Sequence, residues 1–131
     1  MKSLKIITVI LLVFAWTVQN PAVAQAPVHK SVRFSNTVFA LREPKAYART
    51  VLLSKGYSSR QYVCLVKLWN RESHWNYKAD NPTSTAYGIG QLLTETSRLP
   101  DVQIRNGIRY ISYRYGLPCA AWLHWQHHYW Y

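Results

Sequence analysis

The stretch LVKLWNRES, residues 65–73, predicts both a central helix and its chemistry. Four of its residues recur at i, i+3, i+4 and i+7, on one face of an α-helix: Leu65, Leu68, Trp69 and Glu72. Three of these side chains are large and apolar, so we expect this face to be buried. Glu72 therefore stands at the inner end of a hydrophobic stripe.

A carboxyl group at the end of such a stripe has a chemical consequence. Burial in apolar surroundings disfavours the charged form and raises the pKa of the acid. A carboxyl group that keeps its proton near neutral pH is suited to general acid catalysis. The alternative is structural: Glu72 turns to solvent at the helix end or pairs with Arg71.

Three polar motifs follow the stripe in order. They read ESHWN (residues 72–76), ADNPTS (79–84) and AYGIGQ (86–91). Together they resemble the lytic transglycosylase (SLT-type) domain of the goose-type lysozyme-like superfamily. That family carries a Glu-Ser opening, an Asn-Pro-x-Ser loop and a Gly-x-x-Gln element at about this spacing. The resemblance runs from near Pro44 to the last residue and is most specific over residues 64–91.

The resemblance implies a mainly α fold of the α+β lysozyme-like class. We expect one small domain, residues 43–131, of about five helices with a short loop or hairpin region beside an active-site cleft. The implied activity is cleavage of the β-1,4 bond between N-acetylmuramic acid (MurNAc) and N-acetylglucosamine (GlcNAc) in peptidoglycan. In that family one Glu, here Glu72, protonates the leaving oxygen and then acts as a base. The C6 hydroxyl of muramic acid closes onto C1 to give a 1,6-anhydro end, and no cofactor is required.

The resemblance also implies roles for residues around Glu72. Ser84 and Gln91 match positions that line the sugar cleft, and Tyr110 matches a tyrosine that points at the catalytic Glu. Ser73 and Tyr87 belong to the matching motifs, and we expect them to bind substrate as well. Structural alternatives remain for three of them: a turn for Ser84, a helix cap for Gln91 and a core position for Tyr110.

Two positions depart from the family pattern. His74 and Thr85 stand where close relatives often carry glycine. Both are expected beside the cleft, so they bear on substrate preference more than on the type of reaction. Gly88 and Gly90 would let the backbone approach the substrate closely, because they have no side chain.

Aromatic residues supply candidate sugar platforms. Sugar rings stack on aromatic faces, and the polar edges of Trp and Tyr can bond hydroxyl groups. Trp69 lies in the apolar stripe and is expected in the core, whereas Trp75 lies outside it and is the better binding candidate. The cluster at residues 122–131 allows three interpretations, a packed lid, a sugar platform or a core edge, and packing is favoured.

Acids are scarce, which limits the possible mechanisms. Ordinary glycosidases use two carboxylates, and this chain has only five Asp and Glu residues. Asp80 and Glu95 are the candidates for a second carboxylate, which would make the protein a hydrolytic muramidase. Glu43 and Asp101 stand near expected helix starts, where acids complement the helix dipole. A non-catalytic module that only binds cell-wall glycan is a further alternative.

The first residues have the pattern of an export signal. Lys2 and Lys5 precede an apolar run at residues 6–16 and a small-x-small site at residues 22–24. We therefore expect a signal peptide at residues 1–24 and a secreted or periplasmic protein. An uncleaved anchor is the alternative, although the run is short for a membrane span.

Two cysteines fit an oxidising compartment. Cys64 lies in the helix that carries Glu72, and Cys119 lies near the end of the chain. A bridge between them would tie the last helix to the catalytic helix. Two buried free thiols are the alternative.

The charge balance is strongly basic, with 16 Lys and Arg against five Asp and Glu. Such a surface attracts polyanions, so we expect anionic cell-wall polymers as partners beside the peptidoglycan glycan strands. No basic run or nucleic-acid motif stands out, and we expect a monomer without a nucleic-acid partner. A basic secreted protein that acts on membranes or nucleic acid is the remaining alternative.

A group of histidines is the one other set of residues that suggests a bound ligand, in this case a metal ion. His124, His127 and His128 stand at i, i+3 and i+4, a spacing that suits a transition metal. No Glu, Asp or Cys lies among them to complete a tetrahedral site. We therefore expect no metal and a surface that becomes more cationic at acidic pH.

Local signals divide the domain into helices. Pro, Ser and Gly positions predict helices over residues 44–55, 59–71, 101–115 and 120–128. Residues 76–91 are rich in turn formers and predict turns with a small hairpin. Residues 25–42 show no firm period and are expected to form a flexible lead-in.

Overall fold

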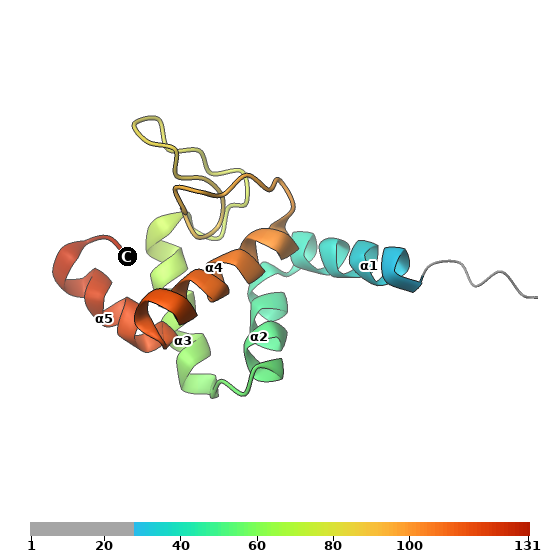
Figure 1. Cartoon of the computed structure of the whole chain (residues 1–131), viewed down its shortest axis with the longest axis horizontal. Coiled ribbons are helices and arrows are strands. Elements are labelled where there is room, and N and C mark those ends of the chain that lie inside the picture. Colours follow the sequence, from blue (N-terminus) through green and yellow to red (C-terminus); the bar gives the residue numbers. More distant parts are fainter. Residues whose placement is uncertain (1–27) are drawn as a thin grey trace, which may run out of the picture.

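The computed structural model describes residues 28–131, which form five helices and one long loop (Figure 1). The helices are α1 (Val28–Arg42), α2 (Pro44–Ser54), α3 (Ser59–Glu72), α4 (Pro100–Tyr115) and α5 (Pro118–His128). The loop between α3 and α4 contains only two isolated antiparallel bridges, Asp80 with Tyr87 and Tyr87 with Leu92. The mainly helical fold is therefore confirmed, and the expected hairpin is reduced to these two bridges.

Proline and glycine set the helix boundaries. A proline lies in the first turn of three helices: Pro44 in α2, Pro100 in α4 and Pro118 in α5. The N–H groups of a first turn have no partner within the helix, so proline, which lacks an N–H, costs no hydrogen bond there. Gly116 ends α4 in the left-handed conformation, with φ 75°. The four predicted helices consequently agree with the structure to within one or two residues at each end.

The N-terminal region differs from the prediction. Residues 28–42 form the regular helix α1, where a flexible lead-in was expected. Ala40 is buried, and the Thr37 hydroxyl donates to the Asp101 carboxylate at 2.9 Å, so specific contacts hold α1 against α4. Phe34 stays 73% exposed. Because large apolar residues of α1 face solvent, its periodicity did not reveal a helix.

The expected signal peptide at residues 1–24 lies outside the described residues, as do residues 25–27 of the expected lead-in. Between residues 28 and 131, no helix combines the length and the apolar character needed to cross a membrane.

The apolar stripe of α3 lies at the centre of the core. Leu65, Leu68 and Trp69 are fully buried, as predicted. Trp69 lies against Gly107 of α4, where an added Cβ would be only 2.5 Å from Cζ2 of the indole. This close approach requires glycine, and it lets α4 cross directly over α3.

A disulfide between Cys64 and Cys119 ties α5 to α3, with the two Cα atoms 4.9 Å apart. The predicted bridge is therefore confirmed. The backbone N–H of Cys119 also donates to the side-chain oxygen of Gln61 at 2.9 Å. Together these contacts place α5 beside the helix that carries Glu72.

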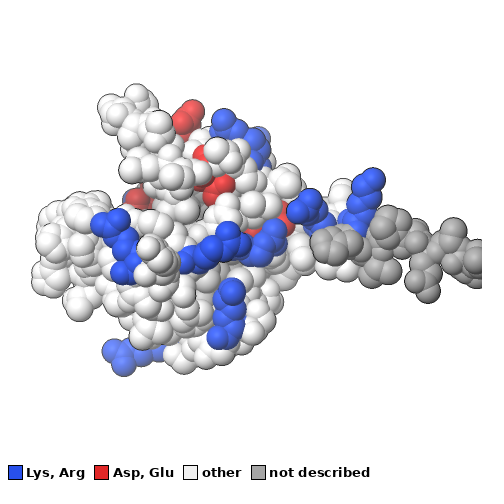
Figure 2. Space-filling model, in the orientation of Figure 1, with Lys and Arg blue, Asp and Glu red and all other residues white. Residues whose placement is uncertain are grey.

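Basic side chains lie over the helical body and over α1, whereas the acidic side chains lie closer to the loop (Figure 2). Asp101 is fully buried and pairs with Arg105 at 2.9 Å. This is the one ion pair within 4.0 Å that residues 28–131 form. Most of the positive charge therefore faces solvent without an acidic partner.

Candidate active site

Glu72 is the last residue of α3 and lies where the helix meets the long loop. Burial raises the pKa of its carboxyl to about 7, and a hydrogen bond with the Trp125 side chain opposes this rise. Its Oε1 atom is buried and has no hydrogen-bond partner among the described residues. Glu72 is therefore partly protonated at neutral pH, and its Oε1 is unpaired and shielded from solvent.

Trp125 reaches Glu72 from α5. Its ring stacks on Trp122 with the centroids 5.5 Å apart, and the Arg71 guanidinium lies 5.6 Å from its ring centre. The indole N–H can donate to a carboxylate, so this contact favours the ionised form of Glu72. Packing was the interpretation that the sequence favoured for residues 122–131. This packing also holds the Trp125 indole N–H close to the Glu72 carboxyl.

Tyr131 lies on the same side of α3. Its hydroxyl accepts a hydrogen bond from Trp69 Nε1 at 2.9 Å and donates to the Gly90 carbonyl at 2.6 Å. Burial, followed by the nearby charge of Glu72, raises the pKa of Tyr131 well above its usual value. An added Cβ at Gly90 would lie 2.9 Å from the Tyr131 hydroxyl, so glycine lets the loop close on this ring.

A groove opens beside these residues, which we name the inner groove. Its volume is about 320 Å³, and its lining combines aromatic, aliphatic and polar side chains. The lining residues are Gln91, Leu92, Leu93, Thr94, Tyr110, Arg114, Trp130 and Tyr131. Two of the predicted site residues, Gln91 and Tyr110, thus lie together in one groove.

Tyr110 is half-buried on α4. Its ring lies 5.7 Å from the Tyr131 ring and 6.4 Å from the Tyr115 ring, both edge-on. Its hydroxyl accepts a hydrogen bond from Arg114 Nη1 at 3.1 Å. Tyr110 therefore packs against the hydrophobic core and forms part of an aromatic wall of the inner groove.

Several predicted site residues hold the loop in place. The buried Ser73 hydroxyl donates to the Ile89 carbonyl at 2.7 Å. The Gln91 amide donates to the carbonyls of Ala79 and Gly88 at 3.2 and 2.9 Å. These bonds occupy the Ser73 hydrogen and the Gln91 N–H groups, which leaves the Gln91 side-chain oxygen as the group that can face a ligand.

Ser84 and Tyr87 lie further along the loop. Ser84 is exposed, and its hydroxyl accepts a hydrogen bond from the Ala86 N–H at 3.2 Å, as the turn interpretation predicted. Tyr87 is half-buried, and the Arg98 guanidinium lies 3.8 Å from its ring centre. Neither residue lines the inner groove.

Trp75 is buried, which corrects its assignment as an outward-facing sugar platform. Only 5% of its surface is exposed, and its ring packs edge-on against Trp69 at 5.0 Å. His74 and Trp75 both have positive φ, 53° and 66°, so the chain reverses immediately after α3. This reversal returns the Trp75 side chain to the core, and its Nε1 finds no partner among the described residues.

The two candidates for a second carboxylate lie in different surroundings. Asp80 is exposed in the loop. Glu95 is half-buried and accepts hydrogen bonds from the Ser97 N–H at 2.8 Å and from Asn106 Nδ2 at 3.1 Å. Burial, and not a nearby carboxylate, is the cause of the raised pKa of Glu72.

The histidines of α5 lie in an aromatic cluster. The rings of His124 and His128 are 4.3 Å apart, and Trp130 lies edge-on to His124 at 4.4 Å. Within residues 28–131, no three His, Cys, Asp or Glu side chains converge in a way that could hold a metal ion.

No family model, no curated protein and no solved structure matches this chain. Sequence reasoning missed Trp125, which lowers the pKa of Glu72 by hydrogen bonding, and Tyr131, whose pKa the charge of Glu72 raises, because both come from a distant part of the chain.

Proposed function

We propose that this protein is an exported lytic transglycosylase that cleaves the MurNAc–GlcNAc β-1,4 bond of peptidoglycan. The observation that supports it most strongly is the half-buried, partly protonated Glu72, whose Oε1 has no hydrogen-bond partner among the described residues. The charge of Glu72 acts on Tyr131, which lines the inner groove. A neutral carboxyl group can donate its proton to a glycosidic oxygen. The expected signal peptide supports action outside the cytoplasm, where peptidoglycan lies.

In the proposed reaction, Glu72 begins protonated and gives its proton to the glycosidic oxygen as the bond to C1 breaks. GlcNAc then leaves with a neutral hydroxyl. The Glu72 carboxylate takes the proton of the muramic acid C6 hydroxyl as that oxygen bonds to C1. This restores the protonated acid and gives a 1,6-anhydro product. The hydrogen bond with Trp125 stabilises the carboxylate between the two steps.

A mechanism with one carboxylate fits the distribution of acids. An ordinary glycosidase needs a second carboxyl group across the scissile bond. Asp80 is exposed in the loop, and Glu95 is already hydrogen-bonded to Ser97 and Asn106. With no second acid held against Glu72, the C6 hydroxyl of the substrate is the better candidate for the nucleophile.

The surroundings of Glu72 favour binding of a sugar chain. Tyr110, Trp130 and Tyr131 offer aromatic faces in the inner groove, on which sugar rings can stack. The basic surface would attract the glycan strands through their acidic groups and would attract other anionic wall polymers. We propose that the protein acts as a monomer and without a cofactor.

The direct test is a digest of purified peptidoglycan by the wild type and by Glu72→Gln, analysed by mass spectrometry. We expect anhydro-muropeptides from the wild type alone. Glu43→Gln, at the exposed start of α2, is the matched control and should cleave normally. Products with reducing ends would indicate a hydrolytic muramidase that uses Asp80 or Glu95. The absence of any Glu72-dependent product on several wall types would favour a glycan-binding module.

A further inference from the structure

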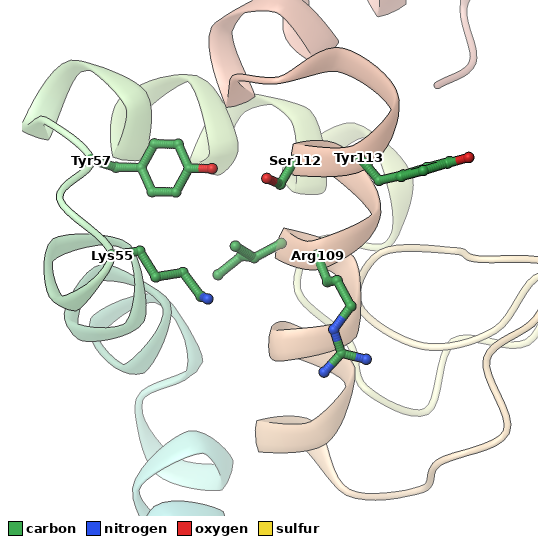
Figure 3. Close-up of a pocket in the computed structure, with 6 residues that line it drawn as sticks. Lys55, Tyr57, Arg109, Ser112 and Tyr113 are labelled. Atoms are coloured by element: carbon green, nitrogen blue, oxygen red, sulfur yellow. The ribbon is translucent and has the colours of Figure 1, made fainter.

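A second pocket lies between the α2–α3 turn and α4. Its volume is about 560 Å³, and it is lined by Lys55, Tyr57, Ile108, Arg109, Ser112 and Tyr113. Figure 3 shows Lys55 and Tyr57 reaching from the turn toward α4, where Ser112 faces Tyr57 and Arg109 extends along the helix. We name it the Lys55 pocket.

The Lys55 pocket carries positive charge that the protein does not neutralise. Lys55 and Arg109 are both exposed, and neither forms an ion pair with any residue from 28 to 131. Glu95 lines the adjoining depression together with Arg109. Its carboxylate already accepts hydrogen bonds from Ser97 and Asn106. The two cations therefore remain available for an external anion.

The rest of the lining suits an organic anion. Ser112 adds a hydroxyl group that can donate a hydrogen bond, whereas the Tyr57 hydroxyl donates to the Gly116 carbonyl at 3.5 Å. Ile108 and the tyrosine rings supply apolar walls, against which a short aliphatic chain can pack. A linear polyanion needs cations spaced along a track, whereas here two cations border a single pocket. The pocket therefore fits one carboxylate carried by a small organic group.

The Lys55 pocket and the inner groove both adjoin a third depression. This depression, of about 370 Å³, lies between them. It shares Arg109 and Tyr113 with the Lys55 pocket, and it shares Leu92, Thr94 and Tyr110 with the inner groove. A branched substrate with its glycan in the inner groove can thus extend a side branch along α4 to Lys55.

We propose that the Lys55 pocket binds a carboxylate on the peptide stems that peptidoglycan carries on its muramic acids. This inference rests on the proposed function, since it assigns the subsite to the same substrate. The stems leave the glycan strand at the lactyl group and end in free carboxylates where they are not cross-linked. Uncross-linked strands are therefore the preferred ligand.

The test measures binding in the Glu72→Gln background, where the ligand stays intact. The probes are soluble glycan strands with uncross-linked peptide stems and the same strands after an amidase has removed the stems. Lys55→Gln/Arg109→Gln should weaken the affinity for stem-bearing strands by about tenfold. Its affinity for stripped strands should not change. The matched control, Arg60→Gln/Lys67→Gln on α3, removes the same charge outside the three depressions.

The proposal is overturned by equal affinity of the double variant and its parent for stem-bearing strands, by equal loss on both kinds of strand, or by equal loss in the control variant. The last two would indicate general charge attraction. A parent protein that binds neither strand would also overturn it. These outcomes are separate from the digest, because the proposed function fails when no Glu72-dependent cleavage occurs, whatever the binding data show.

Discussion

Trp125, in the middle of α5, lowers the pKa of the Glu72 carboxyl at the end of α3 by hydrogen bonding. Burial raises the pKa of Glu72, and Trp125 limits the rise. The balance between desolvation and one hydrogen bond therefore sets the pH range in which the acid carries its proton. The following predictions test that balance and the contacts that maintain it.

Trp125→Phe keeps an aromatic ring and removes the indole donor. The ionised form of Glu72 then loses a stabilising bond, so its pKa rises further above about 7. In the proposed reaction the alkaline limb of the pH–rate profile moves up by about 0.5–1 pH unit, and the maximal rate falls. The profiles of wild type and variant provide the measurement. Trp122→Phe, in the stacking partner, should leave the limb in place; an unmoved limb in both variants would refute the role of Trp125.

Glu72→Gln should stabilise the fold at neutral and alkaline pH. The folded state keeps the Glu72 proton up to about pH 7, while the unfolded state releases it near 4.5. The folded state thus binds more protons in this window, and its stability falls as the pH rises from about 4.5 through 7. Since Glu72 is partly accessible, we expect a gain of only about 1–2 kcal/mol at pH 8.

Urea titrations of both proteins at pH 4 and pH 8 measure this gain in the free energy of unfolding. The difference between the proteins should nearly vanish at pH 4, where both states hold the proton. A difference that is the same at the two pH values would show that the pKa of Glu72 is not raised in the folded state.

Tyr131→Phe removes the hydroxyl that connects Trp69 to Gly90. The indole N–H of Trp69 then remains buried without its partner, and we expect a loss of about 1–3 kcal/mol in the free energy of unfolding. Urea denaturation measures it. Tyr129→Phe is the control, because that ring is 77% exposed and its change should stay within about 0.5 kcal/mol. Equal effects of the two changes would contradict the buried bridge.

Cys64→Ser/Cys119→Ser removes the bond between α3 and α5. The bridge spans 55 residues, for which loop-closure entropy gives about 4 kcal/mol of stabilisation. We expect a strongly lowered melting temperature and a weaker Trp125–Glu72 contact, since α5 loses its link to α3. Reduction of the wild type should reproduce both effects, and a reduced protein with unchanged melting would contradict them.

Local sequence signals were sufficient for four of the five helices. Proline at the helix starts and glycine after α4 act within a few residues, so their effects can be read without the fold. The stripe of Leu65, Leu68 and Trp69 is likewise local, and it predicted the buried face of α3. Helix α1 was not predicted, because its large apolar residues face solvent and give no clear period. Its packing on α4 depends on the hydrogen bond from Thr37 to Asp101, which is 64 residues away.

The candidate site was predictable only in part. The position of Glu72 could be predicted, because the helical period places it at the end of the apolar stripe of Leu65, Leu68 and Trp69. Trp75 was assigned wrongly, because the left-handed backbone at His74 and Trp75 turns the ring inward. No periodicity argument anticipates such a reversal, since it occurs where the helix has already ended.

The sequence by itself determined four of the five helices, the place of Glu72 at the end of the buried stripe and the two cysteines that pair, since each depends on spacing along the chain or on residue type. Only the tertiary structure decided what surrounds the acid. Trp125 and Tyr131 reach the surroundings of Glu72 because the disulfide and the close packing of Trp69 on Gly107 fix α4 and α5 against α3. The pKa of Glu72 depends on desolvation by groups that are distant in sequence, so it becomes defined only when those helices pack.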